Sequence, residues 1–326
     1  MCTGLFLKTN NSYFGRNLDL NYSYDEEVTI TSRNFDFKFR YLENISKHYA
    51  IIGMAFNLDN YPLFYEASNE KGLAIAGLNF PNNTYFNKVV NKSKINLCQF
   101  EFIPYLLSTC KDVKEVVTKL KKINVVDTPF KEGLLPAPLH YLISDLNDNS
   151  ITVELDKDGL KIYKNKYGVL TNNPPFKFQV FNLNNYVNVT NKVVTNRFNK
   201  KLRFETYCVG LGGIGLPGDN SSMSRFVRTV FNKFNLVCDN DELSSINGFF
   251  KILDNVSQIK GVAKADKSSY EMTLYSSCIN LNEGIYYYKT YLNHQISAIK
   301  LFNHDLDNDK VYRYPLINKE NINYQN

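Results

Sequence analysis

The first ninety residues alternate short apolar segments with polar turn residues. Five segments are rich in β-branched and aromatic residues and are separated by Asn, Asp, Gly and Pro, which is typical of strands. They cover residues 13–20, 28–32, 49–56, 63–67 and 73–80. Apolar residues then recur at helical spacing from Val113 to Ile123, with lysines on the other face and Asp112 as a start signal. The pattern predicts a block of sheet followed by an amphipathic helix.

A second block of strands and two further helices complete the pattern. Strand-like segments cover 139–144, 151–155, 160–164 and 168–171, and a closing meander covers 269–276, 284–291 and 296–301. One helix begins after Ser221 or Ser222 as N-cap, and the other covers about 243–256. Strands and helices in separate blocks favour an α+β fold with sheets inside and helices outside. Without a linker or repeat, residues 1–326 are expected to form one domain.

Composition excludes several classes of protein. The net charge of +6 is spread over 326 residues, with Lys and Arg interleaved with acids, so no nucleic-acid partner is predicted. No apolar segment of about 18 residues predicts a transmembrane helix, and the N-terminal segment lacks the apolar region of a signal peptide. Six cysteines without C-x-x-C spacing predict neither a disulfide framework nor a zinc site. We therefore expect a cytoplasmic protein without a membrane partner.

The usual catalytic and cofactor motifs are absent. The sequence has no H-E-x-x-H, G-x-S-x-G or P-loop motif. Residues 210–215 match G-x-G-x-x-G, but they do not open a helix after a strand, so a loop against a ligand or a neighbouring element is predicted instead of a dinucleotide site. The four histidines are scattered, and His140 is interpreted as a core residue. No metal or organic cofactor is expected.

Cys2 is a candidate nucleophile of a different kind. Removal of Met1 would place a thiol and a free α-amino group on one residue. The ordinary pKa of the amine, about 7.7 to 8.0, lies close to the roughly 8.5 of a thiol, so one group could deprotonate the other near neutral pH. This is the principle of an N-terminal nucleophile. Taken alone, a Cys at this position is more simply a small residue in an edge strand.

Several sequence blocks in order resemble the choloylglycine hydrolase family. Met-Cys-Thr-Gly at the start is followed by Tyr-Phe-Gly-Arg-Asn-Leu-Asp at 13–19. Further matching blocks lie at 69–73, 76–81, 139–141, 168–174, 215–219 and 224–226. The resemblance implies an N-terminal nucleophile hydrolase with a four-layer αββα sandwich, often homotetrameric. The family comprises conjugated bile-salt hydrolases and penicillin V acylases.

The resemblance also implies six site residues. They are Cys2, Arg16, Asp19, Asn79, Asn172 and Arg225. Cys2 would be the nucleophile and its own amine the proton acceptor, with one neighbour supporting the thiolate (Arg16) and another holding the amine (Asp19). A guanidinium beside a thiol favours the thiolate, which gives the first of these roles a physical basis.

Two of the remaining three residues would bind the oxyanion, and the third would complete the polar part of the site. The side chain of Asn172 and the backbone N–H of Asn79 would receive the oxyanion, and Arg225 matches the last polar member. Amide donors aimed at a developing oxyanion are worth about 3 to 4 kcal/mol in comparable hydrolases.

Structural alternatives are open for these residues. Arg16 could form a purely structural ion pair in a strand. Strict alternation places Arg16 and Asp19 on opposite faces, so both can serve one site only if the strand bulges or ends near Asn17. Asn172 could be a turn residue before a proline, and Arg225 could merely occupy the first turn of its helix, where a cation is unfavourable.

The pocket must distinguish between the family's substrates. Bile-salt hydrolases that resemble this sequence carry Asn at position 79, whereas penicillin V acylases more often carry Tyr, so we expect an anionic conjugated bile salt and a gut bacterium. Penicillin V acylase or acyl-homoserine-lactone acylase activity is the nearer alternative, and a non-catalytic binder that retains Met1 is the other. Two departures concern the site: Tyr141 replaces a usual Trp, and Cys208-Val209-Gly210 replaces Gly-x-Gly in a segment near the substrate.

Overall fold

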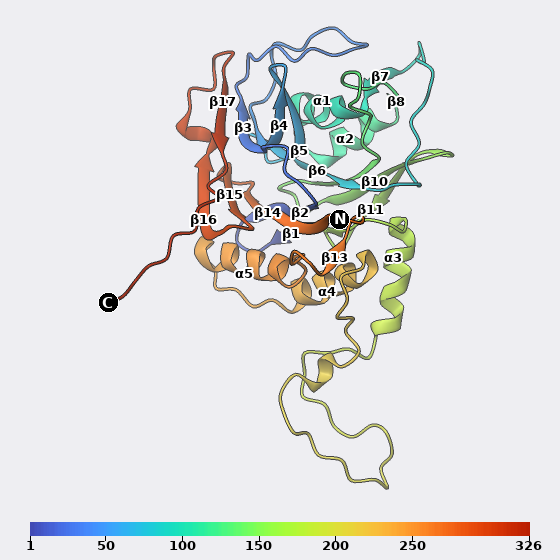
Figure 1. The fold of residues 1–326 in the computed structure, drawn as a ribbon. Helices are drawn as coiled ribbons and strands as arrows, with labels where there is room; N and C mark the ends of the chain where they lie inside the picture. Colours follow the sequence, from blue (N-terminus) through green and yellow to red (C-terminus); the bar gives the residue numbers. More distant parts are fainter.

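The computed structural model describes residues 1–326, and two antiparallel sheets form its centre (Figure 1). The first sheet has seven strands in the order β12-β1-β2-β14-β15-β16, with β13 beside β14. Its strands are β1 (Cys2–Lys8), β2 (Ser12–Leu20), β12 (Val169–Leu170), β13 (Ala263–Lys264), β14 (Tyr270–Asn280), β15 (Ile285–Thr290) and β16 (Asn293–Lys300). The strand that contains Cys2 therefore lies inside the sheet, between β12 and β2.

The second sheet has eight strands in the order β11-β10-β9-β6-β5-β4-β3-β17. They are β3 (Glu27–Thr31), β4 (Ile51–Leu58), β5 (Tyr61–Asn69), β6 (Ala74–Asn79), β9 (Leu139–Ser144), β10 (Ser150–Asp156), β11 (Gly159–Lys164) and β17 (Val311–Pro315). Two short strands, β7 (Ile95–Cys98) and β8 (Ile123–Val126), form a separate parallel pair.

Helices cover the outer face of each sheet. α4 (Ser222–Asn235) and α5 (Glu242–Asp254) pack on the first sheet, and α1 (Phe102–Thr109) packs on the second sheet. α2 (Val113–Leu120) lies in the same layer as α1, and α3 (Phe176–Asn182) lies at the edge of the molecule (Figure 1). The expected α+β fold with four αββα layers is confirmed. None of the helices has the length and apolar character needed to cross a bilayer.

Alternation along the strands divides the core into two layers. In β6, Ala74, Ala76 and Leu78 belong to the cluster shared with the first sheet, whereas Ile75 belongs to the cluster shared with α1 and α2. Successive side chains of a strand point to opposite faces, so one strand serves both layers. The second sheet is therefore buried on both sides.

The structure contains the helices and strands predicted from the sequence, and several that were not predicted. Ile123, assigned from its spacing to the helix, is instead the first residue of β8, because the helix ends at Leu120. Residues 2–8 were not among the predicted strands, since Leu5, Phe6 and Leu7 are all buried and show no period of two. The edge strand considered for Cys2 was wrong in position, because β1 lies between β12 and β2. α1, α3 and β17 were also missed.

Residues 187–221 form an arm that extends away from the layers (Figure 1). Apolar side chains along the arm are exposed: Val187, Val193, Phe198, Leu202, Phe204, Tyr207, Val209 and Ile214. The glycine-rich segment 210–215 lies at its base, where a Cβ added at Gly212 would stand 2.4 Å from the carbonyl oxygen of Thr190. This loop therefore packs against a neighbouring segment, one of the two outcomes expected from its sequence.

Candidate active site

Cys2 and Arg16 lie side by side on the face of the first sheet that meets the second sheet. Cys2 pairs with Leu18 across β1 and β2, and Gly4 pairs with Arg16. These four residues share one face because side chains alternate along each strand. The thiol is buried, and Arg16 is 1% exposed. Gly4 leaves the space opposite Arg16 without a side chain.

Backbone carbonyl groups hold the guanidinium of Arg16 in place. Nη1 donates to the carbonyl of Gly77 at 2.5 Å and to that of Tyr65 at 3.4 Å, both in the second sheet. Nε donates to the carbonyl of Asn17 at 3.3 Å. Nη2 is buried and has no hydrogen-bond partner, so one pair of donors on Arg16 is available to a neighbouring group.

Electrostatics keep Arg16 charged. Burial lowers the pKa of Arg16, but the nearby Cys2, Tyr275, Glu66 and Asp19 outweigh this effect, and the pKa rises above its ordinary value. Cys2 makes the largest of these charge contributions. The positive charge therefore lies where it can act on the thiol.

Asp19 faces the start of the chain on the other side of the sheet. Its backbone N–H donates to the carbonyl of Met1 at 3.0 Å, and the Met1 amine donates to the carbonyl of Asp19 and to the carboxylate of Glu271, both at 2.8 Å. The Asp19 carboxyl accepts from the Thr273 hydroxyl at 2.6 Å through Oδ1, whereas Oδ2 has no partner. Burial raises the pKa of Asp19, although Arg225 and the chain amine counteract this.

The bulge or strand end stated as the condition for Arg16 and Asp19 to share a site does not occur in β2. β2 continues beyond Asn17 without a bulge, because the extra residue of this ladder lies in β14. The two side chains do face opposite sides, and both lie near the start of β1. Arg16 lies on the side of the Cys2 thiol, and Asp19 lies beside the backbone at the chain start.

Asn172 joins the backbone of Cys2 to the second sheet. Its Oδ1 accepts from the backbone N–H of Cys2 at 2.7 Å and from Arg225 Nη2 at 2.7 Å. Its Nδ2 donates to the carbonyl of Asn79 at 2.8 Å, and its own N–H donates to the Ser222 hydroxyl at 2.8 Å. Asn172 therefore does more than form a turn before a proline.

Arg225 projects from the first turn of α4 and is completely buried. Its Nη1 donates to the carbonyl of Cys2 and, at 2.6 Å, to the Thr3 hydroxyl, while Nε donates to the carbonyl of Asn220 at 3.0 Å. Burial lowers the pKa of Arg225, and the charges of Asp19 and Cys2 oppose this change. The structure thus brings all six predicted site residues together, Asn79 through its backbone.

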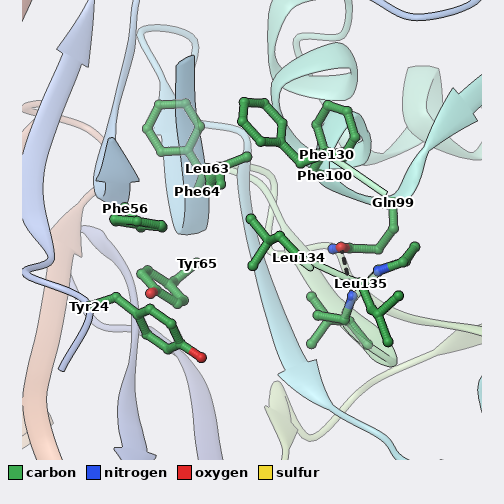
Figure 2. A pocket seen from close by; sticks show the side chains of 13 residues that line it. Tyr24, Phe56, Leu63, Phe64, Tyr65, Gln99, Phe100, Phe130, Leu134 and Leu135 are labelled. Atoms are coloured by element: carbon green, nitrogen blue, oxygen red, sulfur yellow. Dashed lines mark hydrogen bonds between the residues drawn. The ribbon is translucent and has the colours of Figure 1, made fainter. Parts of the chain in front are cut away.

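An apolar pocket of about 230 Å³ lies next to this cluster (Figure 2). Eleven of its thirteen lining residues are hydrophobic. The full lining is Tyr24, Phe56, Leu63, Phe64, Tyr65, Gln99, Phe100, Phe130, Leu134, Leu135, Pro136, Ala137 and Leu139. Tyr24, Phe56 and Tyr65 lie on one side, opposite Leu134 and Leu135 (Figure 2). Tyr65 accepts from Arg16, and Leu139 pairs with Asn79, so the pocket adjoins the site.

Sequence reasoning did not find this pocket. Its residues come from separate loops and strands, and each apolar residue alone resembles core. The only signal was the apolar segment Leu134-Leu135-Pro136-Ala137 in a region without a predicted element.

Other expectations concern residues near the site. His140 is a fully buried core residue that stacks on Phe80 and bonds to the carbonyl of Thr171, as predicted. Tyr141 stacks on Phe102 in the outer core. Cys208-Val209-Gly210 lies in the arm, and none of these residues lines the apolar pocket.

Comparison with known proteins decides the family. The model of the linear amide C–N hydrolases of the choloylglycine hydrolase family matches residues 2–314. The chain belongs to this family. Its members' shared name describes hydrolysis of an amide C–N bond, and the cysteine at the start of β1 lies where the resemblance required it.

Relatives in sequence and structure agree with this assignment. The chain is 47% identical to a bile salt hydrolase/transferase of Lactiplantibacillus plantarum over 97% of both chains. It is 36% identical to the enzyme of the same description from Clostridium perfringens over the full length of both. A solved variant of the conjugated bile acid hydrolase from Clostridium perfringens superimposes with a TM-score of 0.94 at 37% identity, covering 100% of both chains. Penicillin V acylase from Agrobacterium tumefaciens shares the fold, with a TM-score of 0.77 at 19% identity, over 96% of this chain and 90% of that one.

The convergence of hydrogen bonds on Arg225 predicts a large effect of a conservative substitution. Arg225→Lys is expected to lower the free energy of unfolding by about 3 kcal/mol, because a single ammonium cannot reach the acceptors on Cys2, Thr3 and Asn172 together. Urea unfolding measures the change. Arg228→Lys is the matched control on the same helix, since Arg228 is only partly buried and bonds to loop carbonyls. Equal losses in both variants would contradict the prediction.

Proposed function

We propose that this enzyme hydrolyses the amide bond of glycine- or taurine-conjugated bile salts through a thioester on Cys2. The observation that carries the proposal is the position of the Cys2 thiol beside Arg16, whose guanidinium donates to the carbonyl of Tyr65 in the lining of an apolar pocket. An apolar acyl group in the pocket would place its amide next to the thiol. The names of the relatives in Lactiplantibacillus plantarum and Clostridium perfringens support the choice of substrate.

The reaction begins with removal of Met1, which exposes the amine of Cys2. That amine takes the thiol proton, and the thiolate, favoured by Arg16, attacks the amide carbonyl carbon. The negative charge that develops on the carbonyl oxygen is stabilised by the second N–H of Asn172 Nδ2 and by the backbone N–H of Asn79. Asp19, whose Oδ2 has no other partner, holds the ammonium.

Collapse of this intermediate breaks the C–N bond. The Cys2 ammonium gives its proton to the leaving nitrogen, and glycine or taurine departs, leaving a thioester. Water, deprotonated by the neutral amine, then attacks the thioester and releases the free bile acid and the thiol. The amine of Cys2 takes part in every proton transfer. Arg225 keeps the Cys2 carbonyl and Asn172 in register throughout.

Substitution of the nucleophile tests the mechanism. Cys2→Ala is expected to lower the release of amine from glycocholate and taurocholate by at least about 10⁴-fold, because no other thiol lies at the chain start. Circular dichroism and the thermal midpoint should be close to those of the unsubstituted protein. Cys208→Ala, at an exposed cysteine of the arm, is the control and should retain full activity.

Parallel assays separate the alternatives. Release of amine from penicillin V at a higher kcat/KM than from either bile salt would favour the acylase, and intact mass with Met1 fully retained would favour a non-catalytic binder. Substantial turnover by Cys2→Ala would exclude the proposed nucleophile.

The pocket generates a second prediction. Leu135→Asp is expected to raise KM for glycocholate about tenfold, because it replaces an apolar contact with a charge of the same sign as the substrate. Initial rates over a range of glycocholate concentrations measure this. Leu243→Asp is the matched control, since Leu135 and Leu243 are both 79% exposed but Leu243 lies on α5. An unchanged KM in Leu135→Asp would place the acyl group elsewhere.

We also propose that the protein is a homotetramer of one-domain subunits and that the arm, residues 187–221, joins them. Both sheets contribute to one site, which supports a single domain. The arm exposes Phe198, Phe204 and Tyr207, and exposed apolar side chains on an extended segment are typical of a subunit contact. The protein's six free cysteines, one of them exposed in the arm, suit the reducing cytoplasm of a bacterium.

Charge in the arm should prevent assembly. The double variant Phe198→Glu and Phe204→Glu is expected to elute at a smaller mass than the unsubstituted protein, because the substituted charges would be buried at the contact. Size-exclusion chromatography with light scattering measures the mass. Val237→Glu, at a 92% exposed residue between α4 and α5, is the control and should leave the mass unchanged. The same mass for the double variant would rule out the arm as the contact.

A further inference from the structure

A buried carboxylate, that of Glu66, lies next to Arg16 and has no role in the mechanism described above. Glu66 of β5 is completely inaccessible to solvent. It accepts the hydroxyl of Tyr275 at 2.7 Å and that of Tyr286 at 2.5 Å, from two neighbouring strands of the first sheet. Its Oε2 lies 3.9 Å from Nε of Arg16. The four side chains fill the space between the sheets next to Cys2.

Glu66 acts on Arg16 through charge and not through a direct hydrogen bond. A distance of 3.9 Å is too long for a hydrogen bond. Three backbone carbonyls already hold the guanidinium, so its position does not depend on Glu66. Two charges at this separation interact strongly in a site without solvent, because the local dielectric constant is low.

The two tyrosines act as hydroxyl donors to the carboxylate. Burial raises the pKa of Tyr275 and of Tyr286 well above the ordinary value, and the nearby Glu66 raises both further. Burial also raises the pKa of Glu66, while Arg16 and the two hydroxyls oppose this by stabilising the ionised form. Such an arrangement costs free energy unless each polar group has a partner, and here each carboxylate oxygen has one.

We propose that Glu66 is a positioning residue that acts on Cys2 through Arg16: its carboxylate, held by two tyrosine hydroxyls, offsets part of the guanidinium charge and sets the pH range in which the thiol reacts. The proposal rests on the proposed function only in taking Cys2 as the nucleophile. An unopposed Arg16 would stabilise the thiolate down to lower pH, where the amine of Cys2 is fully protonated and cannot act as a base. Glu66 thereby keeps the thiol and the amine of Cys2 active in the same pH range.

Other ionisable groups also face this centre. They are Asp19 on β2, Tyr65 on β5, Glu271 on β14, Arg225 on α4 and the chain amine. Asp19, Glu271 and the amine lie at the chain start, on the far side of the first sheet from Glu66. Substitution of Glu66 leaves all these groups in the protein. A change in the reactivity of Cys2 can therefore be attributed to Glu66.

The test is the pH dependence of Cys2 alkylation by iodoacetamide, followed on the Cys2 peptide by mass spectrometry. Glu66→Gln keeps the shape and an acceptor for a hydroxyl but removes the charge. We expect the midpoint of the alkylation profile to fall by about one pH unit, since the full charge of Arg16 then favours the thiolate.

A second variant and a control complete the experiment. Tyr286→Phe removes one donor and makes Glu66 easier to protonate, so the midpoint should fall by a smaller amount. Asp145→Asn removes another buried carboxylate, which caps α2 on the outer face of the second sheet, and should leave the midpoint unchanged even where the thermal midpoint falls.

Two results would overturn the proposal. Unchanged alkylation midpoints in both Glu66→Gln and Tyr286→Phe would make Glu66 a structural residue only, and a rise would mean that Glu66 holds Arg16 in place. Alkylation requires no substrate. The inference can therefore fail while bile-salt turnover is observed, and it can hold in an enzyme that cleaves another amide.

Discussion

The backbone of Cys2 is the point on which the site depends. Its N–H donates to Asn172, and its carbonyl accepts from Arg225, so side chains from two other elements hold both backbone polar groups of one residue. Because Arg225 also donates to Asn172, the three residues form a closed set of hydrogen bonds. A buried group with several mutually supporting partners has little freedom, so α4, the segment after β12 and the start of β1 are fixed relative to one another.

Two fully buried guanidinium groups lie near Cys2, one on each face of the first sheet. Arg16 lies on the face toward the second sheet and is satisfied chiefly by carbonyls of that sheet, whereas Arg225 lies on the face toward α4. A buried charge is tolerated only when it is paired and hydrogen-bonded. The acids that offset these charges are likewise on opposite faces, Glu66 near Arg16 and Asp19 near Arg225. Cys2 is nevertheless near enough to both guanidinium groups to raise the pKa of each.

The two sheets also differ in what they contribute. The first sheet carries the thiol, the chain start and most of the ionisable groups, while the strands and loops of the second sheet line the apolar pocket. The carbonyls of Tyr65 and Gly77 connect the two, because they bind Arg16 from the pocket side. Chemistry and acyl recognition therefore meet at one guanidinium. The arm, by contrast, leaves the layers altogether and exposes its apolar residues (Figure 1).

The sequence by itself determined the fold class, the family and the six residues, Cys2 among them, that the structure brings together. Strands with a period of two and helices with capped, amphipathic patterns are local features, and the blocks that carry the family resemblance are short and in order. The sequence did not reveal β1, because a strand buried on both faces has no alternation. Only the tertiary structure decided that Arg16 and Asp19 lie on opposite faces of the first sheet, which loops line the pocket, and that Glu66 lies next to Arg16. These relations join strands of different sheets, and no local pattern along a chain encodes the distance between them.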